Sequence, residues 1–260
     1  MSRAHHPSPV AGRRLRPSGV AAVALTLIVA GSAVAAQIHG SPKPDQPHSP
    51  PSPPPAAAPV GSAPATAEPS MAVQPELRWP LDTRLRSVAG LDLPVSATSG
   101  PLDTNRGRAR RFAHTQPGAV LAGLHLLVRT SPQVGPALWG PTLDEQVVGL
   151  DHNAYVAAVR RDYENARERL QLPADAPLGV IYASIRGIRV DAYSPQACSM
   201  RVLIEAPGAD GVILRAATVV QVSWSGSDWQ LVAPPGGDWA RVRTYLPAGA
   251  AVDFTPLPGR

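Results

Sequence analysis

The sequence predicts one α+β domain over residues 112–245, with helices packed on one face of a curved, four-stranded antiparallel sheet. Two patterns carry this prediction. As far as residue 172, apolar residues recur at the spacing of amphipathic helices, and after Pro173 the chain becomes β-branched and alternating, as in strands. Strands that follow one another without helices between them pair antiparallel. Helices first and a meander second therefore indicate an α+β arrangement.

Four stretches before Pro173 have helical patterns. Thr115 can cap a helix that continues to about residue 129. Residues 131–140 predict a short helical turn, and Thr142–Glu145 has the spacing of a capping box and predicts a third short helix. Asp151 precedes the longest helix, whose core-facing stripe is expected to consist of Tyr155, Val159, Tyr163, Ala166 and Leu170.

Alternation predicts strands over residues 178–191, 197–205, 212–224 and 229–232, the first one bent near Gly187. The last two should form a hairpin, because a four-residue loop containing glycine joins them.

Three tryptophans stand near this hairpin. Trp224 and Trp229 flank its loop, Ser225-Gly226-Ser227-Asp228, and are expected to pack together on one face. Together with Trp239 they are candidates for core or protein-contact aromatics. Core packing is the favoured interpretation for Trp224 and Trp229.

The N-terminal segment has the pattern of a membrane anchor. Residues 1–19 carry arginines and no acidic residue, and residues 20–38 contain no charge. The 17 residues from Val20 to Ala36 would span about 26 Å as a helix, near the roughly 30 Å of a bilayer core. The positive-inside rule places the tail in the cytoplasm and the rest of the chain outside. The alternative is a cleaved signal peptide and a secreted protein, since Ala33-Val34-Ala35 offers small residues at a cleavage site.

Residues 39–111 are expected to be a proline-rich, disordered stalk and linker, because their first half has too few large apolar residues for a core. Residues 246–260, with three prolines, are expected to be a flexible tail. The linker ends in an arginine cluster that lacks interleaved aromatics, so no direct nucleic-acid binding is expected. A solvated linker end or contact with an anionic partner surface are the alternatives for Arg106, Arg108, Arg110 and Arg111.

No motif for catalysis, a cofactor or a metal occurs in the sequence, and its single cysteine, Cys198, is expected in the core. An enzyme would need an acid, a tyrosine or a histidine that can serve as proton donor or acceptor. The only candidates are Asp191, Tyr193, Tyr182 and His125, and none has a partner at a diagnostic spacing. A core position is the favoured interpretation for His125.

Two segments resemble a known family. Residues 221–232, QVSWSGSDWQLV, and residues 112–120, FAHTQPGAV, are similar to the last hairpin and the helix entry of actinobacterial single-pass proteins found on conjugative and integrative elements. Those proteins resemble the VirB8 and TcpC components of type IV secretion systems. The resemblance implies an NTF2-like (cystatin-like) cone outside the cytoplasm, with no catalytic residue to transfer. Departures are the short anchor, the unusual richness of the stalk in proline, and the tail.

The sequence and this resemblance together predict a non-catalytic assembly component. Its expected partners are the membrane, through residues 20–38, and other envelope or transfer-complex proteins, and a homo-oligomer stays open. The alternative is an anchored or secreted module that binds a small ligand or a cell-wall component. A cone filled with apolar side chains would favour assembly, whereas an open pocket with convergent polar groups would favour ligand binding.

Overall fold

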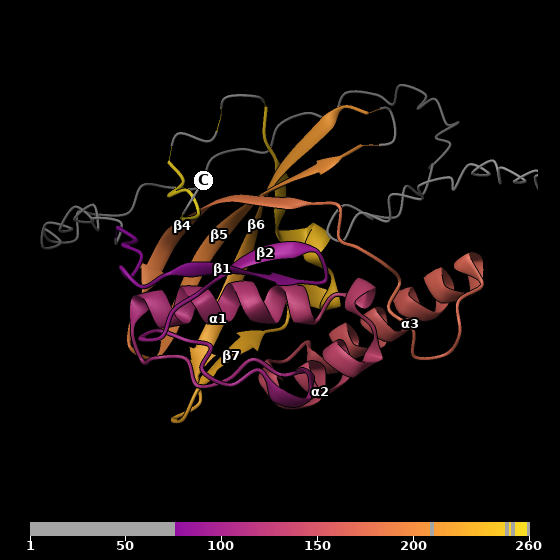
Figure 1. Ribbon diagram of the computed structural model, residues 1–260, viewed down its shortest axis with the longest axis horizontal. Helices are drawn as coiled ribbons and strands as arrows, with labels where there is room; N and C mark the ends of the chain where they lie inside the picture. Colours follow the sequence, from indigo (N-terminus) through magenta and orange to yellow (C-terminus); the bar gives the residue numbers. More distant parts are fainter. Residues whose placement is uncertain (1–75, 209–210, 248–249, 251–252, 259–260) are drawn as a thin grey trace, which may run out of the picture.

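The computed structural model describes residues 76–208, 211–247, 250 and 253–258. These residues form three α-helices, a six-stranded sheet and a separate two-stranded sheet (Figure 1). The mixed α+β class is therefore confirmed. The expected membrane span at residues 20–38 lies outside the described residues, and none of the helices within them is long and apolar enough to cross a bilayer.

The prediction of a four-stranded sheet is wrong. The expected meander is present, but two further strands extend it: one pairs parallel with β7, and the other pairs with the first part of β6. Two- and three-residue strands show no alternation, so the sequence pattern could not reveal them. The strand order is β3 (Val147–Val148), β7 (Trp229–Val232), β6 (Ile213–Trp224), β5 (Ala197–Pro207) and β4 (Ser184–Tyr193), and β8 (Arg243–Tyr245) lies beside β6.

β4 begins six residues later than expected. The residues before it leave the sheet because they pack elsewhere: the Leu178 amide donates to the Gln133 carbonyl, and the Ile181 amide donates to the Ala89 carbonyl. A register shift between Ile185 and Gly187 interrupts the ladder with β5, at the expected position of the bend.

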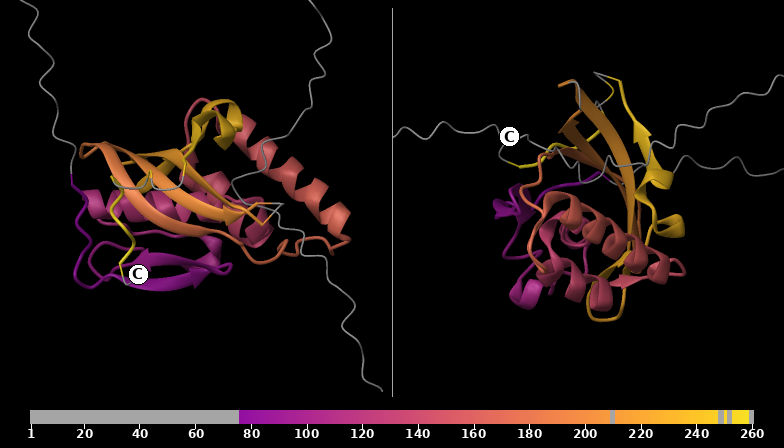
Figure 2. Two further views of the ribbon diagram at one scale, coloured as in Figure 1. Left: turned by 90° about the horizontal axis from the view of Figure 1, so that it is seen from above. Right: turned by 90° about the vertical axis from the view of Figure 1, so that its right-hand side faces the viewer.

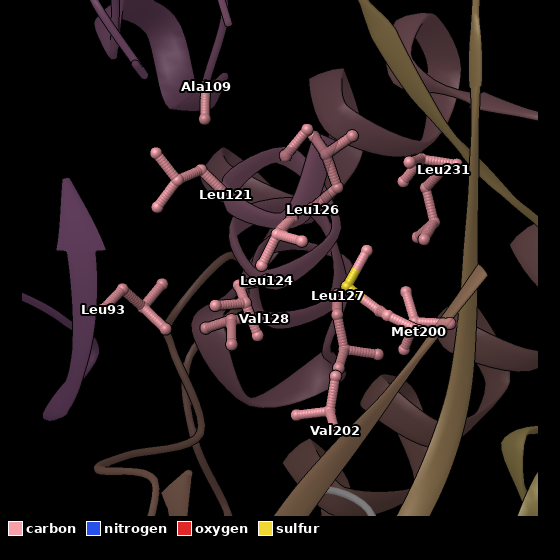
Figure 3. Packing of buried hydrophobic residues seen from close by; sticks show 14 of the residues in the cluster. Leu93, Ala109, Leu121, Leu124, Leu126, Leu127, Val128, Met200, Val202 and Leu231 are labelled. Carbon is pink, nitrogen blue, oxygen red and sulfur yellow. The ribbon is translucent and has the colours of Figure 1, made fainter. Parts of the chain in front are cut away.

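Helix α1 (Gln116–Arg129) is the centre of the domain. The Thr115 hydroxyl accepts a hydrogen bond from the Gly118 amide, which confirms the predicted cap. Every residue from Gly118 to Arg129 is buried, so the helix has no solvent face. Figure 3 shows Leu93 of β2 on one side of α1, and Met200, Val202 and Leu231 of the large sheet on the other.

A hairpin of β1 (Arg84–Val88) and β2 (Leu91–Val95) covers the side of α1 opposite the large sheet (Figure 3). Ala89 and Gly90, with φ of 50° and 85°, form its two-residue turn in the left-handed region that such hairpins require. Leu91 and Leu93 are buried in the core. The expected linker over 39–111 is therefore corrected in its last part, because residues 77–111 belong to the folded unit (Figures 1 and 2).

Helix α2 (Pro136–Gln146) replaces the two short helices expected before residue 149. The capping box predicted at Thr142 is wrong, because the Thr142 hydroxyl donates to the Leu138 carbonyl inside one continuous helix, at 2.8 Å. Helix α3 (His152–Leu170) follows Asp151 as expected, although no side-chain cap forms there. The predicted core stripe is confirmed for Tyr155, Val159, Tyr163 and Ala166, and Leu170 is only half-buried.

The expected flexible tail is also corrected where it is described. Leu257 is 2% exposed and belongs to the core cluster, and Thr255 forms a β-bridge with Ile188. Residues 253–258 thus lie along the outer edge of β4, which is otherwise the edge strand of the large sheet.

Candidate functional site

The turn between β6 and β7 holds an aromatic cluster. Trp229 is fully buried, and its ring meets that of the half-buried Trp224 edge-on, with centroids 5.3 Å apart. The two residues also face each other in the β6–β7 register. The prediction that these tryptophans pack together is confirmed.

His114 completes this cluster, and sequence reasoning missed it. Its imidazole stacks on the Trp224 ring at a centroid distance of 4.0 Å, with the planes 9° apart. Its Nε2 lies 2.5 Å from the Pro195 carbonyl oxygen in the turn between β4 and β5. The Tyr193 ring lies 6.4 Å from that of Trp229. The one sequence feature that could have indicated His114 is its position within one of the two segments that carry the family resemblance.

The loop residue Asp228 ties the hairpin to the start of α1. Its carboxylate accepts hydrogen bonds from the backbone amides of Arg111, at 2.6 Å, and Phe112, at 3.1 Å. The Trp229 indole donates to the Ala113 carbonyl at 2.9 Å. The two resembling segments, more than 100 residues apart, are therefore one structural unit that anchors the entry of α1 to the sheet.

Trp239 is held in a second, separate network. Its indole donates to the Tyr155 hydroxyl at 2.9 Å, and that hydroxyl donates to the Thr130 hydroxyl at 2.8 Å. Burial raises the pKa of Tyr155 to about 12, so this phenol stays protonated as the network requires. Trp239 thus links the short 3₁₀ segment Trp239–Val242 to α3 and α1 as a packing residue.

The arginine cluster divides into paired and unpaired members. Arg108 contacts the Glu145 carboxylate, and this guanidinium lowers the pKa of Glu145 below its usual value. Arg110 lies 3.9 Å from Asp103. Arg106 and Arg111 are exposed, and within the described residues no ion pair engages them. Within this cluster, the alternative of an anionic partner surface is therefore left to these two arginines.

The candidate catalytic residues do not converge. Asp191 lies between two arginines on the solvent face of the sheet, 3.1 Å from Arg189 and 2.9 Å from Arg201. Tyr193 packs on the aromatic cluster, and Tyr182 is 56% exposed in the segment before β4. Each side chain therefore has its own separate surroundings.

His125 and Cys198 are core residues, as expected. His125 is 1% exposed, and burial lowers its pKa to about 4. The ring is therefore neutral near pH 7, and Nε2–H donates to the Pro94 carbonyl at 2.9 Å, which links α1 to β2. Cys198 is 2% exposed, and burial raises the pKa of its thiol to about 12, so it is not a reactive thiolate.

The interior near α1 is filled by apolar side chains. A cavity of about 10 Å³, room for a single water molecule at most, is lined only by apolar residues such as Leu91, Leu127 and Ile185. Among the residues that the structure describes, no three metal-ligating side chains gather in one place.

The strand ends with the most exposed apolar side chains lie at the end of the large sheet opposite the β6–β7 turn. β5 and β6 continue as a pair beyond Glu205, where the pairing with β4 stops, and their tip stands clear of the helices (Figure 1). We call this extension, with the adjoining Tyr245 of β8, the arm. Val212, Ile213 and Tyr245 are 58%, 57% and 56% exposed. Apolar side chains on a protruding hairpin are typical of protein contact surfaces.

A family model described as "Domain of unknown function (DUF8175)" matches residues 42–249. The chain belongs to this family. The DUF8175 match includes the large sheet, the β1–β2 hairpin and the arm, and it ends before the segment 253–258. Searches of curated proteins and of solved structures gave no match.

Proposed function

We propose that this DUF8175 protein is a non-catalytic assembly component of the cell envelope, anchored by residues 20–38 and docked through its folded domain onto other subunits of a conjugation or type IV secretion-like complex. The observation that carries the proposal is the arm, which exposes Ile213 and Tyr245, while the side chains packed between the helices and the sheet are mostly apolar. An interior packed with apolar side chains favours docking at the surface over binding of a ligand inside.

The NTF2-like fold is part of this proposal. Three helices precede an antiparallel meander of β4, β5, β6 and β7 in chain order, as the resemblance implies. In such a fold, the side chains of the buried helix α1 and of the β1–β2 hairpin would fill the cone. A filled cone leaves the outer surface for partners.

A charged side chain placed on the apolar surface of the arm tests this function. In the host, Ile213→Arg should reduce the amount of envelope complex recovered with the cross-linked, full-length protein by about tenfold, as expected when one central apolar contact is lost. The frequency of DNA transfer should fall in parallel. The stability of the domain should change by less than about 0.5 kcal/mol, because Ile213 is exposed.

The matched control is Leu150→Arg, since Leu150 is fully exposed in the loop before α3, away from the arm. That variant should recover the complex as well as the unchanged chain does. Equal losses in both variants, or no loss in either, would contradict docking through the arm.

A further inference from the structure

The edge of β4 already binds a peptide, namely the segment 253–258 of the same chain. Ile188 and Thr255 exchange both of their backbone hydrogen bonds, at 2.9 and 2.8 Å. The Trp79 indole donates to the Pro256 carbonyl at 2.8 Å. The segment therefore adds to the sheet as an extended strand would. The Trp79 indole holds Pro256, the residue that follows the paired Thr255.

Side chains on both sides of Thr255 make specific contacts. Leu257 enters the core cluster and is 2% exposed. The Phe254 ring lies under the Arg189 guanidinium, 5.6 Å from its centroid, and Asp253 lies 3.8 Å from the same arginine. Arg189 thus contacts both the acidic residue and the aromatic ring, and the aliphatic side chain is buried separately in the core cluster.

Gly187 shapes the groove. A Cβ atom at this position would lie 2.7 Å from Cβ of Phe254 and 3.1 Å from the Thr255 carbonyl oxygen. The backbone φ of Gly187 is not in the left-handed region, so the close approach of the segment, and not the backbone conformation, is what requires glycine here.

The groove lies within the family match, and its occupant lies beyond it. Trp79, Gly187, Ile188 and Arg189 lie within the residues that match DUF8175, and the segment lies beyond them. The segment is held by one backbone-paired residue, one indole hydrogen bond, the contacts of Arg189 with Asp253 and Phe254, and one buried leucine. This is a short local set of contacts compared with the ladders of the large sheet.

We propose that the edge of β4 is a peptide-binding groove and that residues 253–258 are its resident occupant. The groove also accepts an extended segment of a partner with the same order of residues: an acidic residue, an aromatic residue, a residue that pairs with β4, a proline and an aliphatic residue. The resident segment would then regulate access by competition. This inference does not depend on docking through the arm, because the groove is a separate surface with its own residues.

The test uses the full-length chain with Phe254→Ala and Leu257→Asp, two changes that remove contacts of the resident segment and so empty the groove. We call this variant the emptied chain, and the probe is a fluorescent peptide of sequence DFTPLP. Fluorescence anisotropy should show roughly tenfold tighter binding to the emptied chain than to the unchanged one, because a tethered occupant competes at a high effective concentration. Gly187→Val added to the emptied chain should abolish binding, since its side chain would fill the space of Phe254.

The control peptide carries the same two changes, DATPDP, and should bind at least tenfold more weakly than DFTPLP. Equal binding of both peptides, or equal affinity of the emptied and unchanged chains, would overturn the proposal. Loss of cooperative thermal unfolding in the emptied chain would also overturn it, because the segment would then be an integral strand. Dimers of the unchanged chain that disappear in the emptied one would show that a second copy is the occupant instead.

Discussion

Trp229→Ala is expected to lower the free energy of unfolding by about 3–5 kcal/mol, the range for deleting a large aromatic side chain from a core. Trp229 is fully buried, and it contacts the rings of His114, Tyr193 and Trp224. Its indole also satisfies the Ala113 carbonyl at the entry of α1. The change therefore leaves a cavity and an unpaired acceptor at the joint between hairpin and helix.

Urea unfolding followed by circular dichroism measures this effect without relying on tryptophan fluorescence. Trp224→Ala is the matched control, because Trp224 lies in the same cluster but is only half-buried, and it should cost about 1–2 kcal/mol. Equal losses for the two variants would show that Trp229 is not the centre of the joint.

Stability should fall as the pH decreases from about 6.5 to about 4, because His125 is neutral in the folded state. Its folded pKa is about 4 and its unfolded pKa is near 6.5, so in this window the unfolded chain binds the additional proton. The unfolding free energy should therefore lose about 3 kcal/mol across the window, and this contribution is fully present above pH 6.5.

His125→Gln isolates this contribution. The glutamine amide can still donate toward the Pro94 carbonyl but does not titrate, so the stability of the variant should vary much less between pH 6.5 and 4. The measurement is the unfolding free energy at half-unit pH steps for both proteins. The same slope in both would mean that His125 is not the group that titrates.

The parts of the fold with regular local patterns were predictable from sequence. The cap at Thr115, the meander and the Trp224–Trp229 pair all follow from residues near one another in the chain, where spacing and turn chemistry determine structure. The burial of His125 was also expected, because no second ligand accompanied it. These features depend on local contacts, which a single sequence can display.

The missed features depend on contacts between distant segments. β3 and β8 are strands only because β7 and β6 lie beside them, and the β1–β2 turn uses Ala89 in a left-handed conformation that alanine seldom adopts. His114 stacks on a residue more than 100 positions away. The tail packs because Gly187 leaves room for it, and no pattern within the tail itself indicates that.

Protease treatment of intact protoplasts that carry the full-length, tagged protein tests whether the folded domain is held outside the cell membrane, as we propose. We predict that the full-length chain fractionates with the membrane and that added protease reaches the domain. A shorter form released into the medium, or a membrane-bound form that protease cannot reach, would contradict the proposal of an anchored domain outside the membrane.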